Sequence, residues 1–279
     1  MNGKVVVVTG GTSGIGQVAA EALARRGARI VLVARDPIRA EQALIRLRQA
    51  GPEAAHTVHL ADLSKMAAVR RVGADIAAFE PRIDVLVNNA GAMFSARQLT
   101  AEGLERTFAT NHMSYFLLTE MLLPSLRAAG AARIVSTASD AHRGARLDLD
   151  DLQSEKSYSG FRVYSNSKLL NILWTRELAR RLEGTGVVAN CLHPGFVATR
   201  FGDQSGGFLQ LLMPIAKLFA INPEQGAETI VHLASSDEGG TVSGAYWVQS
   251  KQAEPTKAAQ DDDSAARLWE ESARIAGLS

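Results

Sequence analysis

Short runs of aliphatic and β-branched residues alternate along the chain with longer stretches in which apolar residues recur every three to four positions. A short run fits a strand that is buried on both faces of a parallel sheet, and the longer period fits an amphipathic helix. We therefore expect a three-layer, doubly wound α/β protein in which helices cover both faces of a parallel seven-stranded sheet. The expected strands are Val5–Thr9, Arg29–Ala34, Ala55–Leu60, Ile83–Asn88, Arg133–Thr137, Val187–Leu192 and Gly244–Val248.

The first expected strand leads directly into a glycine-rich turn and then into a helical pattern. Glycine has no Cβ, so its backbone can come close to a ligand, and the N-terminus of the following helix offers free N–H groups and a partial positive charge. The turn therefore predicts a pyrophosphate site, although a purely structural turn would show the same pattern. The residues concerned are Gly10, Thr12, Ser13, Gly14, Ile15 and Gly16.

Charges at the end of the second expected strand bear on the choice of dinucleotide. Asp36 stands 20 positions after Gly16, where a carboxylate would bind the free 2′-hydroxyl of NAD. Ala34 is neutral, however, and Arg35 follows it directly, with Arg39 one turn further on. A guanidinium suits the 2′-phosphate of NADP. We expect NADP (NADPH) with NAD as the alternative, and a solvated surface charge is the other interpretation of Arg35.

Tyr164 and Lys168 are four positions apart and therefore lie on one face of a helix. A free tyrosine titrates near 10. A neighbouring ammonium favours the phenolate, so we expect Lys168 to lower the pKa of Tyr164 toward neutral pH. Ser139 follows the fifth expected strand, where the carbonyl-binding residues of an open α/β sheet should lie, and Ser136 is the rival serine.

These segments occur in the order of the short-chain dehydrogenase/reductase family, which they resemble. The resemblance covers nearly the whole chain and is closest to the retinol dehydrogenase-like branch. The matching strings are Thr9-Gly10-x-x-x-Gly14-x-Gly16, Asn88-Asn89-Ala90-Gly91, Thr110-Asn111-His112, Asp151-Leu152-Gln153, Tyr164-x-x-x-Lys168, His193-Pro194-Gly195 and Thr175–Leu182.

The resemblance implies a Rossmann fold and an oxidoreductase that moves a hydride between a nicotinamide cofactor and a small-molecule carbonyl or alcohol. It implies a catalytic tetrad of Asn111, Ser139, Tyr164 and Lys168, in which Lys168 also binds the nicotinamide ribose. Asp62 would meet the adenine or, alternatively, cap the helix that starts near Ser64. Further implied cofactor contacts are Arg35, Arg39, Leu63, Asn89, Ala90, Gly91, Tyr164, Pro194, Gly195, Val197 and Thr199.

Two other functions stay open on the same pattern. One is a non-catalytic regulator that senses a dinucleotide, and the other is an epimerase or dehydratase. Two histidines are not assigned to catalysis. His112 points about 100° away from Asn111 around a helix and is expected to pack. His193 has no second ligand at metal spacing, so no metal is expected.

We expect one domain over residues 1–279, with an insert at 141–161 and a substrate lid at 200–222. Within the lid, the apolar run Phe208–Ile221 carries Lys217 and Pro214 and is too short for a membrane span. It predicts a lipophilic substrate; a core helix and a surface that docks on a bilayer are the alternatives.

The composition limits which partners, covalent cross-links and cellular locations we expect. The net charge of +1 provides no field that would attract nucleic acid. The single cysteine allows no intramolecular disulfide. We expect no signal peptide or anchor, because only Met1-Asn2-Gly3 precede the stretch that begins at Lys4 and contains the first strand. We expect a cytoplasmic protein without a membrane span, either a monomer or a homo-oligomer.

Overall fold

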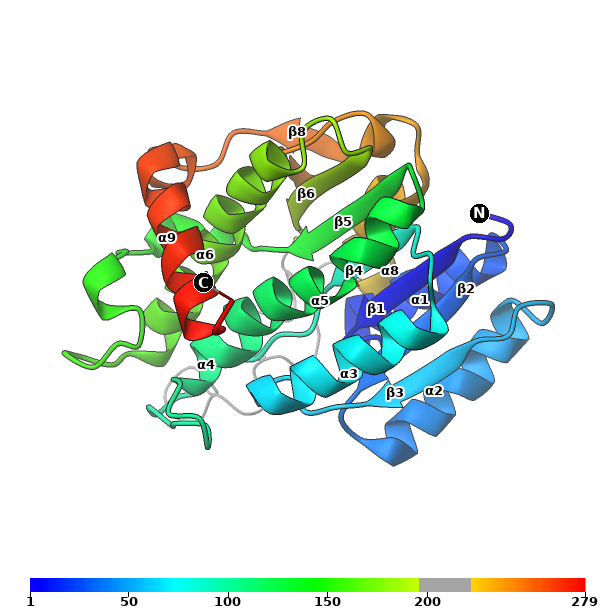
Figure 1. The fold of residues 1–279 in the computed structure, drawn as a ribbon, viewed down its shortest axis with the longest axis horizontal. Helices are drawn as coiled ribbons and strands as arrows, with labels where there is room; N and C mark the ends of the chain where they lie inside the picture. Colours follow the sequence, from blue (N-terminus) through cyan, green and yellow to red (C-terminus); the bar gives the residue numbers. More distant parts are fainter. Residues whose placement is uncertain (196–221, 279) are drawn as a thin grey trace.

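The computed structural model describes residues 1–195 and 222–278. One sheet lies at its centre, with the strand order β3-β2-β1-β4-β5-β6-β7-β8 (Figure 1). Strands β1 to β7 are parallel, and every strand end lies within two residues of the predicted one. Their bounds are β1 (Val5–Thr9), β2 (Arg29–Ala34), β3 (Thr57–Leu60), β4 (Val85–Asn88), β5 (Ala132–Thr137), β6 (Val187–His193) and β7 (Tyr246–Val248).

The sheet has an eighth strand that the sequence did not predict. Strand β8 (Lys251–Ala253) runs antiparallel to β7, and Tyr246 pairs with Ala253. Gln249 and Ser250 form the turn between them with φ of 50° and 58°. The strand is three residues long and mostly exposed at the edge of the sheet, so it has no apolar run by which it could be recognised. The expected seven-stranded parallel sheet is therefore extended by one antiparallel edge strand.

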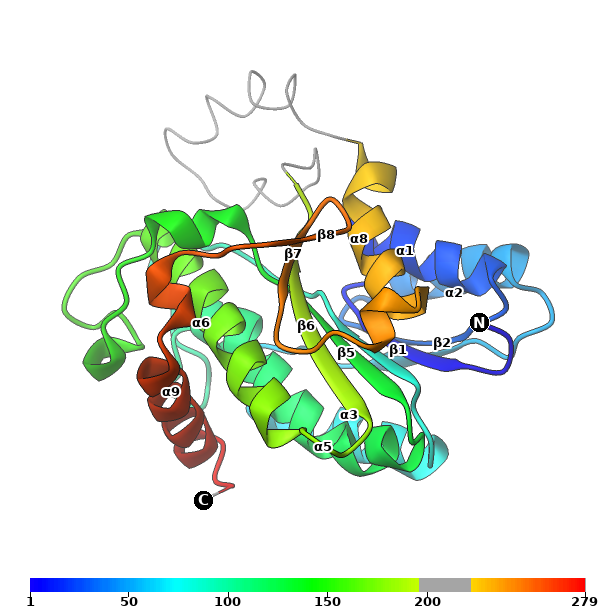
Figure 2. The same ribbon diagram turned by 90° about the horizontal axis from the view of Figure 1, so that it is seen from above.

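Helices cover both faces of the sheet, and Figure 2 shows the two outer layers edge-on. On one face lie α1 (Gly14–Arg25), α2 (Pro37–Ala50) and α8 (Pro223–Ser235). On the other lie α3 (Met66–Phe79), α5 (Ser114–Ala128) and α6 (Gly160–Arg181), with α9 (Asp262–Ile275) packed outside α6. Short elements are α4 (Arg106–Phe108), the π-helix η1 (Ala109–Met113), η2 (Asp140–Gly144), η3 (Leu149–Asp151), η5 (Glu238–Gly240) and η6 (Lys257–Gln260).

The valines of β1 show why a short apolar run becomes a central strand. Successive side chains of a strand point to opposite faces. Val6 and Val8 therefore enter the core beneath α1 and α8, whereas Val7 enters the core beneath α3 and α5. All three are fully buried. A strand that is buried on both faces therefore has consecutive apolar residues, as β1 does.

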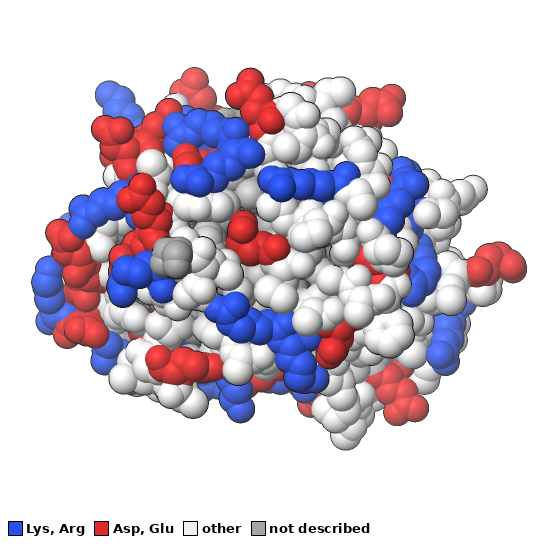
Figure 3. All heavy atoms as spheres, viewed as in Figure 1, with Lys and Arg blue, Asp and Glu red and all other residues white. Residues whose placement is uncertain are grey.

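The C-terminal helix α9 packs against α6. Leu268 is fully buried, and Trp269 packs edge-on against Phe116 with ring centroids 5.1 Å apart. Ion pairs join the two helices at their ends, with Asp262 2.9 Å from Arg176 and 3.1 Å from Arg180. Figure 3 shows acidic and basic side chains interspersed over this face. Trp174 and Leu178 on α6 are buried in the same core.

The insert at 141–161 folds back onto the loop before α4. Gln153 accepts a hydrogen bond from the Glu105 N–H at 2.6 Å, and the Tyr158 hydroxyl donates to the Phe94 carbonyl at 2.9 Å. Of the lid at 200–222, residues 200–221 lie outside the described part of the chain; Asn222 caps α8 by accepting from the Gln225 N–H. Across residues 1–195 and 222–278, every helix falls short of the length and apolar character that crossing a bilayer requires.

Candidate active site

Most of the sequence-predicted site residues that the structure describes lie at the carboxyl ends of β1, β4, β5 and β6 or on η1 and α6. The others follow β2 and β3: Arg35, Arg39, Asp62 and Leu63. The chain runs outward from β1 to β3 and then crosses back to β4 on the other side of β1. Loops that leave β1 and β4 therefore diverge above the sheet, which is where open α/β sheets bind their ligands.

The glycine turn after β1 lies against the turn after β4. Gly10 has φ of +68°, and a Cβ placed on it would lie 2.8 Å from the Ala90 Cα. A Cβ on Gly16 would lie 2.5 Å from the Gly10 carbonyl oxygen and closer still to the Asn89 amide nitrogen. Only glycine fits this contact.

The N-terminus of α1 opens from this turn and keeps its donors free of side-chain caps. Ser13 is the N-cap residue and makes no side-chain cap hydrogen bond. The first N–H groups of a helix that no side chain caps suit an anion. The chemistry of this donor set therefore fits the pyrophosphate of a dinucleotide. The turn and the first residues of the helix are those predicted from the sequence: Gly10, Thr12, Ser13, Gly14, Ile15 and Gly16.

Threonine and asparagine side chains tie the ends of three strands together. The Thr9 hydroxyl accepts from the N–H groups of Asn89 and Ala90 at 2.9 and 3.1 Å. The Asn89 amide nitrogen donates to the Gly10 carbonyl at 3.3 Å, and the Thr137 hydroxyl donates to the Asn89 amide oxygen at 3.3 Å. The contribution of Thr137 was missed from the sequence, because a threonine at a strand end has no distinctive spacing.

The charged residues after β2 and β3 differ in whether they have a hydrogen-bond partner among the residues that the structure describes. Asp36 is the N-cap of α2 and accepts from the Arg39 N–H at 3.0 Å, so its carboxylate already has a structural partner. Arg35 is exposed, as is Arg39. Burial would raise the pKa of Asp62, but hydrogen bonds from Ser64 and the positive charge of Arg35 hold that pKa below its ordinary value.

Asp62 does not cap α3. Its carboxylate accepts from the Ser64 N–H at 3.1 Å and from the Ser64 hydroxyl at 2.8 Å, which closes a turn before the helix. Lys65 is the N-cap residue of α3. Leu63, between them, is buried. The alternative interpretation of Asp62 as the helix cap is therefore wrong, because α3 begins two residues later than the sequence suggests.

Asn111 lies in the π-helical turn η1 and is fully buried. Its amide oxygen accepts from the Ala92 N–H at 2.8 Å, and its amide nitrogen donates to the Ala92 carbonyl at 2.9 Å and to the Ser167 hydroxyl at 3.0 Å. Its own carbonyl accepts from the Asn171 side chain at 2.9 Å. The Asn111 side chain thus links the loop after β4 to α6.

Ser139, Tyr164 and Lys168 meet at one point of the site. Ser139 and Tyr164 share a side-chain hydrogen bond. The Lys168 ammonium lies 5.5 Å from the centre of the Tyr164 ring and donates to the Thr137 carbonyl at 3.0 Å. Ser136, the rival serine, is fully buried within β5, and its hydroxyl contacts no hydrogen-bond partner in the described part of the chain. The structure therefore pairs Ser139, and not Ser136, with Tyr164.

Gly91 lies beside the Asn111 amide and the Lys168 ammonium. A Cβ on Gly91 would lie 3.4 Å from the Asn111 amide oxygen and 3.6 Å from the Lys168 ammonium nitrogen. The small residue therefore keeps open the space beside both groups. Asn89 and Ala90 precede it in the turn after β4.

Burial sets the protonation of the two titrating groups, and for Tyr164 it overturns the expectation from the sequence. Burial raises the pKa of Tyr164 to about 12, with the Ser139 hydrogen bond opposing it. Burial lowers the pKa of Lys168 to about 7. Lys168 is only 2% exposed, and its desolvation disfavours the charged ammonium that was expected to lower the pKa of Tyr164. The phenol is protonated at neutral pH and can donate a proton.

The histidines occupy structural positions. His112 is fully buried between Asn171, 3.3 Å from its Nδ1, and Ser272 of α9, 2.9 Å from its Nε2. Burial lowers its pKa to about 4, so it packs as a neutral ring, as predicted. His193 ends β6, and its Nδ1 accepts from the Asp140 N–H at 3.2 Å. Pro194 and Gly195 follow His193 directly; Val197 and Thr199 lie outside the described residues.

Comparisons with known proteins agree with this architecture. A family model described as "short chain dehydrogenase" matches residues 4–207. Human retinol dehydrogenase 14 is 41% identical over 295 residues, covering 100% of this chain and 88% of its own length. Human retinol dehydrogenase 13 is 41% identical over 285 residues, covering 99% and 85%.

Solved structures are similar over the same range. The crystal structure of an uncharacterised protein from Mycobacterium paratuberculosis superposes with a TM-score of 0.80 at 31% identity, covering 99% of this chain and 94% of that one. The Pseudomonas aeruginosa RhlG/NADP active-site complex has a TM-score of 0.70 at 28% identity, covering 88% and 94%. The chain therefore belongs to the short-chain dehydrogenase/reductase family, is similar to its retinol dehydrogenases, and is a nicotinamide-dependent oxidoreductase.

Proposed function

We propose that this protein is an NADP-dependent reductase or dehydrogenase that interconverts a lipophilic carbonyl compound and its alcohol. The observation that carries the proposal is the contact between Ser139 and a protonated Tyr164, with Lys168 beside them. A protonated phenol is the form that reduction of a carbonyl requires. A nicotinamide dinucleotide, when bound, supplies or accepts the hydride.

Each residue then has a task in the reduction. Ser139 holds and orients the carbonyl oxygen through its hydroxyl. Tyr164 donates a proton to that oxygen as it gains negative charge. In its protonated form, the Lys168 ammonium, 5.5 Å from the centre of the ring, stabilises the phenolate that remains. Asn111 holds the loop after β4 in place through Ala92, and so keeps the space beside Lys168 open.

The preference for NADP rests on the residues after β2. Arg35 is exposed at the strand end, and Asp36 is engaged in capping α2, so the guanidinium is the group available to a 2′-phosphate. Two similar structures are titled as complexes with NADP: the RhlG complex and a short-chain dehydrogenase from Burkholderia cenocepacia, which is 26% identical with a TM-score of 0.71.

The lipophilic substrate rests on the relatives. Several are named retinol dehydrogenases, and retinol is an apolar alcohol. The apolar run Phe208–Ile221 fits such a substrate by composition. The cytoplasmic location, the oligomeric state and the single-domain boundary stay predictions from the sequence.

A binding and turnover series tests the proposal. NADPH and NADH are titrated by nicotinamide fluorescence, and turnover is then followed at the nicotinamide absorbance band with decanal, retinaldehyde and glyceraldehyde. We expect NADPH to bind about fivefold more tightly than NADH, because a screened, exposed charged contact contributes roughly 1 kcal/mol. We expect both apolar aldehydes to be preferred over glyceraldehyde. Preference for glyceraldehyde would contradict the substrate class, and binding without any turnover would favour the dinucleotide-sensing regulator.

A further inference from the structure

The turn that carries Ser139 is held by a histidine that the proposed mechanism does not use. The Ser139 carbonyl accepts two hydrogen bonds from His142, one from its backbone N–H at 3.1 Å and one from its ring Nδ1 at 2.7 Å. The Ser139 hydroxyl also accepts from the Ala141 N–H at 3.2 Å. Ser139 therefore presents its hydroxyl from a closed turn in which His142 supplies two of the donors.

The second ring nitrogen of His142 reaches a distant part of the chain. Nε2 accepts from the Thr256 N–H at 3.2 Å, in the segment between β8 and η6. A carbonyl can only accept and a backbone N–H can only donate, so the ring must be neutral with its proton on Nδ1. Burial lowers the pKa of His142, in keeping with that state, since the side chain is only 1% exposed.

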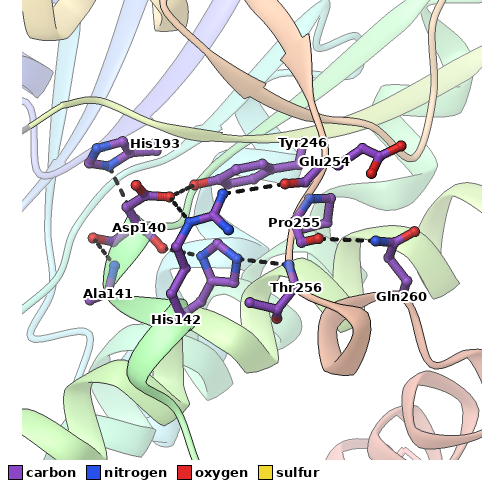
Figure 4. Close-up of polar contacts among 11 residues, drawn as sticks. Asp140, Ala141, His142, His193, Tyr246, Glu254, Pro255, Thr256 and Gln260 are labelled. Carbon is purple, nitrogen blue, oxygen red and sulfur yellow. Dashed lines mark hydrogen bonds and ion pairs between the residues drawn. The ribbon is translucent and has the colours of Figure 1, made fainter.

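The neighbours of His142 hold the ring and the turn in one arrangement. Tyr246 of β7 packs edge-on against the ring, with centroids 5.2 Å apart. The Tyr246 hydroxyl donates to the Asp140 carboxylate at 3.2 Å, and Arg143 donates to the same oxygen at 2.9 Å. The Asp140 N–H donates to His193 at the end of β6. Figure 4 shows these groups converging on the turn from β6, β7 and the segment after β8.

We propose that His142 is a positioning residue, which fixes the Ser139 hydroxyl relative to Tyr164 by linking the Ser139 carbonyl to the Thr256 N–H. The inference deepens the proposed function and rests on it for its kinetic consequences. Placement of a reacting group is sensitive, because a displacement of about 1 Å can cost on the order of 100-fold in rate. The ring does not touch the reacting atoms in this role.

The two ring bonds can be removed separately. His142→Asn places an amide nitrogen near the position of Nδ1 and keeps a donor for Ser139. His142→Gln places an amide near the position of Nε2 and keeps an acceptor for Thr256, whereas His142→Ala keeps neither. Thr256→Pro removes the distant donor, and the φ of −61° at Thr256 is one that proline adopts. Thr256→Ala keeps the N–H and is the matched control.

Steady-state turnover of decanal with NADPH gives the kinetic readout. We expect His142→Ala to lower kcat about tenfold while the fluorescence Kd for NADPH is unchanged, because the turn contacts the substrate oxygen and not the dinucleotide. His142→Asn should recover most of the lost rate, and His142→Gln should not. Thr256→Pro should lower kcat, and Thr256→Ala should match the wild type. Equal kcat in wild type and His142→Ala would overturn the proposal.

Hydrogen–deuterium exchange, read by mass spectrometry, tests the same role without turnover. The peptide that contains residues 139–145 should exchange faster in His142→Ala and Thr256→Pro than in the wild type, and at the wild-type rate in Thr256→Ala. Unchanged exchange in His142→Ala would overturn the role of His142. A wild-type protein that turns over none of the aldehydes would contradict the proposed function instead, and the exchange result would still decide the role of His142.

Discussion

The two sides of the site are built by different means. On the side of β1 and β2, backbone atoms approach one another so closely that a Cβ on Gly10 or Gly16 would collide with them, and the charged residue Arg35 is exposed. On the side of β4, β5 and α6, polar side chains are buried and hydrogen-bonded, as Asn111 and Lys168 show. The first side therefore requires residues without a Cβ atom, whereas the second requires particular buried polar side chains.

This difference predicts how each side responds to change. Adding a methyl group disturbs a close backbone contact, whereas removing a polar atom from a buried network leaves its partner unsatisfied. Changes on the first side should therefore act mainly on the affinity for the dinucleotide. Changes on the second should act on turnover, on stability and on the response of both to pH.

The largest expected effect comes from removing one oxygen on the second side. Tyr164→Phe should lower kcat about 10³-fold, because the proton donor is lost, while the Kd for NADPH stays close to the wild-type value. Turnover and fluorescence titration measure the two quantities. Tyr158→Phe is the matched control, because the Tyr158 hydroxyl donates to the Phe94 carbonyl in the insert. A Tyr164→Phe enzyme with wild-type turnover would remove the basis for the assigned chemistry.

Acid should destabilise the second side through His112. The folded-state pKa of about 4 lies below the ordinary 6.5, so the unfolded chain takes up a proton first as the pH falls. The neutral His112 ring makes its full contribution to the free energy of unfolding above pH 6.5. That contribution is lost progressively as the pH falls from 6.5 to about 4, and the total loss is about 3 kcal/mol. Urea unfolding at several pH values measures it. His112→Gln should give a flatter profile than the wild type; equal slopes would show that other groups dominate.

A single methyl group should disturb the first side. Gly16→Ala places a Cβ 2.5 Å from the Gly10 carbonyl, so the turn must move. We expect a loss of about 2 kcal/mol of stability, which exceeds the gain of up to about 1 kcal/mol from the better helix propensity of alanine. NADPH should also bind more weakly. Gly144→Ala is the control, because a Cβ there meets nothing within 4 Å. If both variants unfold and bind alike, the close packing of the turn has no energetic consequence.

The smallest expected effect concerns the exposed charge. Arg35→Ala should weaken NADPH binding about fivefold and leave NADH binding unchanged, since a screened surface contact is worth roughly 1 kcal/mol. Parallel titrations of the two cofactors measure it, and raising the salt concentration should narrow the difference. Equal weakening of both cofactors would argue against a contact between Arg35 and the 2′-phosphate.

Much of the architecture was predictable because it depends on local patterns. The seven parallel strands follow from short apolar runs, and the turn after β1 follows from its glycines. Strand β8 was missed, because its three exposed residues carry no such run. The choice of Ser139 over Ser136 was made from position alone, and the structure supports it through the Tyr164 contact. His142 gave no signal, because its partner Thr256 is 114 residues away.

The sequence by itself determined the order of strands and helices, the glycine turn and the spacing that brings Tyr164 and Lys168 onto one helix face. These follow from backbone geometry over a few residues. Only the tertiary structure decided that the pKa of Tyr164 rises instead of falling, and that His142 is neutral between Ser139 and Thr256. Both depend on how far packing removes a group from water and on which distant partner reaches it. The local pattern of apolar and polar residues predicts neither the extent of desolvation nor the identity of the distant partner.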